Sequence, residues 1–131
     1  MLANHMLANI DATAMLAVKD LERARDFYED VLGLEAVGGM EGHLITYRSG
    51  ASRVSVYVSD YAGTNQANAL AWHVRDVDGL VHALKAKGVA FEHYDLPGMR
   101  LEGDIHVAEE GDMRGHWFKD PDGNVLHIVS G

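Results

Sequence analysis

Apolar residues recur at helical spacing in two stretches of the chain, residues 21–32 and 77–84. Residues three or four positions apart form one buried stripe of an α-helix. An aspartate, Asp20 or Asp76, precedes each stretch, where its side chain can accept hydrogen bonds from the helix N-terminus. Gly33 and Gly88 follow, where a left-handed C-cap belongs. The pattern predicts two helices, with apolar stripes formed by Leu21, Ala24, Tyr28, Val31 and Leu32 and by Val77, Leu80, Val81 and Leu84.

The two helices belong to an internal repeat. Val18 and Asp20 recur at one common offset as Val74 and Asp76, each pair closing a short strand-like run before its helix. Further strand-like runs follow each helix, separated by glycine-rich turns. They span residues 34–38, 43–48 and 53–59 in the first half and residues 89–94, 113–119 and 124–130 in the second. Each half is therefore predicted to be a βαβββ module, and the fold class is α+β.

The modules are predicted to span residues 9–60 and 69–131, to be joined by a linker at residues 61–68 and to form one domain. Residues 1–8 repeat the letters MLAN and are interpreted as a cloning remnant or a disordered N-terminus. Residues 95–112 form the longest segment without a strand or helix pattern. A loop of this length is either a lid over a binding site or a disordered surface excursion.

Composition excludes several functions. The net charge is -9 and the chain has no cluster of Lys and Arg, which argues against nucleic acid as a partner. Without any cysteine, disulfides, thiolate catalysis and cysteine-ligated metals are excluded. No apolar run reaches the roughly 18 residues of a membrane span. A basic region followed by an apolar one, as in a signal peptide, is also missing, so we expect a cytoplasmic protein.

Two motifs carry a family resemblance. VKDLERARDFYEDVLGL opens the first module and WFKDPDGNVLHIV closes the second. Together they resemble the vicinal oxygen chelate superfamily, which includes glyoxalase I, bleomycin resistance proteins, fosfomycin resistance enzymes and extradiol dioxygenases. GTNQANALAW and FEHYDLPG are similar to a bacterial glyoxalase-like subgroup whose activity is mostly unassigned. The resemblance implies that each module curls into a concave sheet, that the sheets surround a cleft, and that the protein is a homodimer.

The resemblance also indicates where a metal would bind. The four ligand positions of metal-dependent members correspond to Thr13, Ser55, Ala69 and His127. Of these side chains, only the imidazole of His127 commonly ligates a transition metal, whereas a zinc-like ion needs three or four converging donors. We therefore predict no metal and no other cofactor.

The histidines near the C-terminus are the candidate catalytic residues. If residues 120–123 form a four-residue hairpin loop, His116 pairs with His127, and cross-strand partners share a face of the sheet. Both imidazoles would then face the cleft, where they could act as acid or base or hold an adventitious metal. In the alternative interpretation, His127 is half-buried and bonded to a backbone carbonyl, while His116 is exposed to solvent at the rim of the cleft. The sequence leaves both open.

Strand alternation and aromatic character select the other candidates for ligand contact. Small residues on the first strand of each module leave room in the cleft, and aromatic residues could form its walls. Trp72 and Trp117 point to the opposite face of their strands and are predicted to lie in the core beneath the helices. The candidate ligand-binding residues are Thr13, Met15, Tyr47, Ser55, Tyr57, Ala69, His73, Tyr94, Phe118 and Val125.

Three functions remain in view. The first is a metal-free protein that binds a small apolar or aromatic metabolite or antibiotic, because metal ligands and a catalytic constellation are missing. The second is a metal-independent lyase or isomerase that uses His127 or His116 as acid or base. The third is a metal-dependent glyoxalase or dioxygenase with a displaced site. Whether the protein is an enzyme is left open.

Overall fold

The computed structural model describes residues 6–130 and confirms the first βαβββ module. It contains β1 (Thr13–Val18), α1 (Leu21–Arg25), the π-helical turn η1 (Asp26–Val31) that continues α1, β2 (Glu35–Met40), β3 (Leu44–Ser49) and β4 (Ser52–Val58). The N-cap is the predicted one, because Asp20 accepts hydrogen bonds from the backbone of Glu22 and Arg23. Of the N-terminal segment 1–8, residues 1–5 lie outside the described residues.

The second module repeats this order and adds a hairpin. It contains β5 (Asn68–His73), α2 (Val77–Ala86), β6 (Phe91–Glu92), β7 (Met99–Glu102), β8 (Ile105–Ala108), β9 (Arg114–Lys119) and β10 (Val125–Ser130). The segment 95–112 is therefore not irregular throughout, since β7 and β8 form a hairpin around Gly103, whose φ is +63°. Its outer strand is only four residues long and mostly exposed, so the strand pattern it leaves in the sequence is short. The strand predicted at residues 89–94 is shortened to β6.

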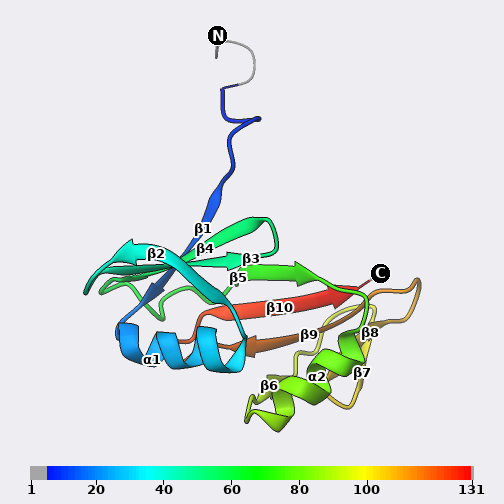
Figure 1. Cartoon of the computed structure of the whole chain (residues 1–131). Coiled ribbons are helices and arrows are strands. Elements are labelled where there is room, and N and C mark those ends of the chain that lie inside the picture. The colour runs from blue at the N-terminus through cyan, green and yellow to red at the C-terminus, as the bar shows by residue number, and fades with distance from the viewer. Residues whose placement is uncertain (1–5, 131) are drawn as a thin grey trace.

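The strands form two sheets with equivalent pairing. One has the order β1-β4-β3-β2 and the other β5-β10-β9-β8-β7, with β6 also pairing with β9. In each, the first strand runs parallel to the last, and the remaining described pairs are antiparallel. Both helices lie on one side of the strands (Figure 1). We call this the helix side and the opposite face of both sheets the open face.

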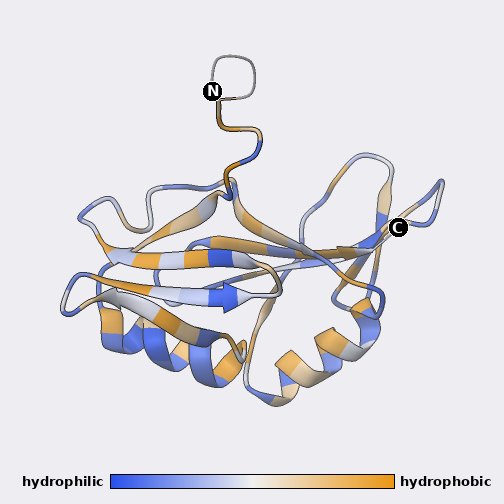
Figure 2. Ribbon diagram, turned by 45° about the horizontal axis from the view of Figure 1, so that its top comes forward, coloured by the Kyte–Doolittle hydropathy of each residue, from blue (hydrophilic) through white to orange (hydrophobic). Residues whose placement is uncertain are grey.

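The larger of two hydrophobic clusters joins the modules on the helix side, and the smaller one lies between α2 and β8. Leu16, Val56 and Leu126 alternate with open-face residues along their strands and are almost completely buried. Tyr28 and Leu84 bring one helical segment of each module into the same cluster. Figure 2 shows hydrophobic and hydrophilic positions alternating along both helices, as expected for surface helices with one buried stripe. Among the described residues, no helix is both long and apolar enough to cross a membrane.

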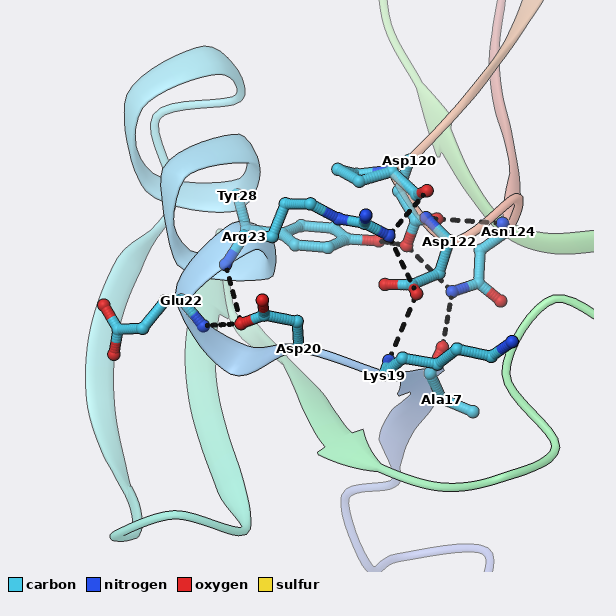
Figure 3. Close-up of polar contacts among 10 residues, drawn as sticks. Ala17, Lys19, Asp20, Glu22, Arg23, Tyr28, Asp120, Asp122 and Asn124 are labelled. Carbon is cyan, nitrogen blue, oxygen red and sulfur yellow. Dashed lines mark hydrogen bonds and ion pairs between the residues drawn. The ribbon is translucent and has the colours of Figure 1, made fainter.

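The loop between β9 and β10 fastens the second module to the first (Figure 3). The buried Asp120 carboxylate accepts hydrogen bonds from the Tyr28 hydroxyl at 2.7 Å and from the Asn124 amide at 2.8 Å. The same amide donates to the carbonyl of Ala17 at 2.8 Å. Burial, together with the charge of Asp120, raises the pKa of the Tyr28 hydroxyl, which therefore stays a donor. The DPDGN motif is thus a structural joint.

Candidate functional site

The register of the last hairpin differs from the predicted one by a single residue. Val125 pairs with Lys119, and His127 pairs with Trp117. The connecting loop has five residues instead of four, because the backbone of Asp120 bonds the carbonyl of Asn124 and its carboxylate accepts the Asn124 N–H. The prediction that His116 pairs with His127 is therefore wrong. A shift of one residue exchanges the two faces of a strand.

Three of the candidate site residues lie on the helix side, two of them because of this shift. His116 and Phe118 are both completely buried there, with their rings stacked at a centroid distance of 5.8 Å. Burial lowers the pKa of His116 to about 4, so its imidazole is neutral. Tyr47 is also in the core, and its hydroxyl donates to Glu29 at 2.9 Å. Trp72 lies beneath the helices as predicted, whereas Trp117 faces the open side.

His127 is held on the open face in one orientation. Its ring stacks on Trp117 with a centroid distance of 4.1 Å and an interplanar angle of 14°. Nδ1 lies 3.1 Å from the backbone carbonyl oxygen of His116. Because that oxygen can only accept, Nδ1 carries the proton and Nε2 keeps its lone pair. Burial lowers the pKa of His127, which favours this neutral form.

The backbone of Gly115 makes room for this imidazole. A Cβ atom at residue 115 would lie 2.9 Å from Cε1 of His127 and 3.1 Å from the carbonyl oxygen of Ile128. Any larger residue would therefore push the His127 ring or separate the strands. Gly115 is thus a fixed part of the pocket in which His127 sits.

An aromatic cluster extends from His127 across the sheet. The ring of Trp117 meets His106 edge-on at 4.7 Å and Tyr94 at 5.5 Å. The backbone N–H of Tyr94 donates to Nε2 of His106 at 2.9 Å, which fixes the chain after β6. Sequence reasoning missed His106 and Trp117 as open-face residues. The alternation of Ile105, His106 and Val107 within β8 was the signal for His106.

A cavity of about 340 Å³ lies between β1 and β5, where the two modules meet. Met15, Tyr57 and Ala69, all predicted ligand residues, line it together with Asn68 and the linker. The Asn68 side chain accepts a hydrogen bond from Nε1 of Trp117 at 2.9 Å, so the cavity adjoins the aromatic cluster. We call the cavity and this cluster the open-face site. No charged side chain is among the residues that line the cavity: Met15, Leu16, Ala17, Tyr57, Tyr61, Gly63, Thr64, Asn65, Asn68, Ala69 and Asn124.

The remaining predicted ligand residues lie outside this cavity. Thr13 is exposed on β1, and His73 is exposed at the end of β5. Val125 is buried on the same face as His127. A larger, open groove of about 880 Å³ lies between the start of α1 and the β2–β3 hairpin, and none of the predicted site residues lines it.

The donors required for a metal centre do not come together. Ser55 is buried, and its hydroxyl is 2.8 Å from that of Thr46. Ala69 provides no donor at all, which leaves His127 as the only strong ligand among the four positions that the family resemblance indicates. Within residues 6–130, no three His, Cys, Asp or Glu side chains form a group that could hold a metal ion. The residues present do not fit a metal centre of the kind the resemblance implies.

Comparison with known families agrees with this fold. The model of the Glyoxalase/Bleomycin resistance protein/Dioxygenase superfamily matches residues 9–128. The chain belongs to this superfamily. No curated protein matches the chain. Membership establishes the βαβββ pair, while the superfamily's own name spans several different activities.

Solved structures support the same assignment. The lactoylglutathione lyase of Agrobacterium tumefaciens is 21% identical with a TM-score of 0.69, covering 94% of each chain. The fosfomycin resistance protein FosX of Listeria monocytogenes is 19% identical with a TM-score of 0.67, covering 92% of this chain and 91% of that one. A superfamily member from Sphaerobacter thermophilus is 25% identical with a TM-score of 0.65, covering 92% and 96%. The superfamily relatives with named activities thus share the fold at low identity.

Proposed function

We propose that the protein binds a small apolar or aromatic molecule, such as a metabolite or an antibiotic, in the open-face site without a metal. The observation that carries this proposal is the uncharged lining of the cavity between β1 and β5. Its wall combines apolar side chains such as Met15 and Ala69 with tyrosines and asparagines, which favours a neutral ligand with a flat apolar body and several hydrogen-bonding groups. The stacked Trp117 and His127 beside the cavity offer an aromatic surface for such a body.

Filling the cavity tests this proposal. Ala69 is half-buried on β5 and lines the cavity, so Ala69→Phe should occupy the space that the ligand needs. Native mass spectrometry of the wild-type protein should find a retained molecule or, after a screen of aromatic compounds, a stoichiometric ligand. Its affinity should fall by at least about tenfold in Ala69→Phe and stay unchanged in Ala83→Phe, a control on the exposed side of α2. Equal affinity in the two variants would refute binding at this cavity.

A second candidate function rests on the fixed imidazole of His127. A neutral ring with its proton on Nδ1 has Nε2 free to accept a proton, as a general base requires. The protein would then be a lyase or isomerase that acts on the ligand of the same site. His116 does not take part in this proposal, since it is buried on the helix side.

Replacement of His127 separates binding from catalysis. At saturating ligand, His127→Gln should abolish the conversion or deuterium exchange of the bound ligand, as followed by NMR, because the glutamine amide cannot act as a base. Gly115→Ala should slow the same reaction by displacing the ring, because a Cβ would approach Cε1 of His127. If the wild-type protein binds its ligand and neither converts it nor exchanges its protons, the protein is a binding protein only.

We also propose that two copies associate through the open face. Met15 on β1 is 53% exposed, and Tyr61, which lines the same cavity, is 79% exposed, so the open face carries large side chains that no described part of the chain covers. A second copy of the chain could bury them. Light scattering after size exclusion should give a dimer mass for the wild-type protein and a monomer mass for Met15→Lys. A monomeric wild-type protein would refute the proposal.

A further inference from the structure

A second cavity lies at the joint of the two modules on the helix side. Its volume is about 230 Å³. The end of η1, the end of β3, α2 and the central strands of the second sheet line it, so that both modules contribute, and it is open to solvent on one side. It is separate from the open-face site. Its lining includes Trp72, Phe118 and Ile128, which alternate with the open-face residues of their strands and therefore point to the other face of the sheet.

The wall of this cavity is almost entirely apolar. Leu32, Val74 and Leu80 line it from three different elements, and no charged side chain is among its lining residues. Its one polar side chain is that of Ser49, whose oxygen accepts a hydrogen bond from Nε1 of Trp72 at 2.8 Å. Water against this wall would find few hydrogen-bond partners on the protein, since an ordered water needs two to four.

We infer that this cavity, which we call the joint cavity, is a binding site for a compact uncharged aromatic molecule. Cavities of about 150 Å³ that are lined by leucine, isoleucine and phenylalanine side chains hold benzene. The joint cavity is larger and has the flat indole of Trp72 and the ring of Phe118 on its wall. Aromatic rings prefer offset or edge-on contact with one another, which favours an aromatic occupant over an aliphatic one. The inference is independent of the function proposed for the open face.

The two tryptophans of the chain report on the two sites separately. Trp72 lines the joint cavity and Trp117 belongs to the open-face site, and the chain contains no other tryptophan. Each therefore gives one indole N–H resonance in a two-dimensional nitrogen–proton NMR spectrum of the full chain, and Trp117→Phe assigns them. Titration with benzene should shift the resonance of Trp72. If Trp72 does not respond, the inference is wrong, whatever Trp117 does.

Two variants locate the benzene. Val74→Phe should fill the joint cavity and weaken binding by at least about tenfold, whereas Val37→Phe, at a 43% exposed position on β2, should leave it unchanged. Leu80→Ala enlarges the cavity and should still bind benzene, which guards against a loss of binding through poor folding in Val74→Phe. Unchanged affinity in Val74→Phe, or a loss in Leu80→Ala as well, would overturn the inference.

A second copy of the chain is the competing occupant. In that case the Trp72 resonance would move on dilution of the protein without benzene, and that result would also overturn the inference. A Trp72 that responds to benzene while Ala69→Phe has no effect on any ligand would leave the joint cavity established and remove the open-face site.

Discussion

Two turns contact the opposite module, and they differ in the hydrogen bonds that they make with it. They occupy equivalent places in the repeat, one between β3 and β4 and one between β9 and β10. The β9–β10 loop contacts η1 and β1 through a buried set of hydrogen bonds centred on Asp120. The β3–β4 turn contacts β5 through one hydrogen bond, from Nε1 of Trp72 to Ser49.

The difference explains where the molecule is tightly fitted and where it is hollow. A buried carboxylate must keep all of its donors, so the Asp120 loop can satisfy them in only one arrangement of the modules. A single hydrogen bond at the edge of an apolar surface imposes no such constraint. The joint cavity lies on that weakly connected side, lined by Ser49 and Trp72. The repeat thus contains two similar turns. The hydrogen bonds of the β9–β10 loop hold the modules together, whereas the β3–β4 turn only lines the joint cavity.

The largest effect on stability is expected from removing the Asp120 carboxylate, on which the hydrogen bonds of the β9–β10 loop are centred. Asp120→Ala would leave the Tyr28 hydroxyl, the Asn124 amide and two backbone N–H groups without their acceptor. We expect the free energy of unfolding to fall by about 4 kcal/mol, because several buried donors lose their partner together. Urea denaturation measures this change, with the exposed Asp60→Ala as a control. A loss below about 1 kcal/mol would mean that the two turns do not differ as argued.

Acid should act next most strongly, through His116 beside the joint cavity. Its pKa falls to about 4 in the folded chain through burial and the nearby His127, against about 6.5 when unfolded. Between these two values the unfolded state binds the extra proton, so stability falls as the pH drops from about 6.5 to 4, by about 3 kcal/mol in total. Denaturation at pH 7, 5.5 and 4.5 should show this loss in wild type and less of it in His116→Leu. Parallel pH profiles would contradict the argument.

The same loop shows how far sequence reasoning could reach. Helix caps at Asp20 and Asp76, the βαβββ repeat and the buried parity of Leu126 and Ile128 follow from local patterns, and the structure confirms them. The length of the loop does not, because hydrogen bonds between Asp120 and Asn124 close it at five residues and the Asn124 amide also bonds the carbonyl of Ala17, far away in the chain. The hydrophobic pattern carries no sign of these bonds, and the predicted register was therefore displaced by one residue.

The error in register propagated to the candidate site. It placed His116 in the cleft and Trp117 in the core, whereas each lies on the opposite face. Met15, Tyr57 and Ala69 line one cavity, since their strands carry no such loop, and their role as ligand contacts stays a prediction. The contribution of Asn68, which joins that space to Trp117, is a contact between side chains of different strands and has no signature in the local pattern.

A smaller loss of stability is expected when only one hydrogen bond of the β9–β10 loop is removed. Tyr28→Phe deletes the hydroxyl that donates to Asp120 and keeps the ring in the core. We expect a loss of about 2 kcal/mol, the typical value for a hydrogen bond to a charged group. Combined with Asp120→Ala, it should add almost nothing, because its partner is already missing. Full additivity of the two losses by denaturation would contradict this prediction, because it would mean that the Tyr28 hydroxyl and Asp120 contribute independently.

The smallest effect is expected at the other turn. Ser49→Ala removes the acceptor of Nε1 of Trp72, but the indole is only partly buried and can turn its N–H to water. We expect a loss of about 0.5 kcal/mol in urea denaturation, with the exposed Asp60→Ala as the control. Benzene binding at the joint cavity should persist, since the wall becomes more apolar. A loss of stability as large as that of Tyr28→Phe would mean that the β3–β4 turn also holds the modules together. The two turns would then not differ in the way argued here.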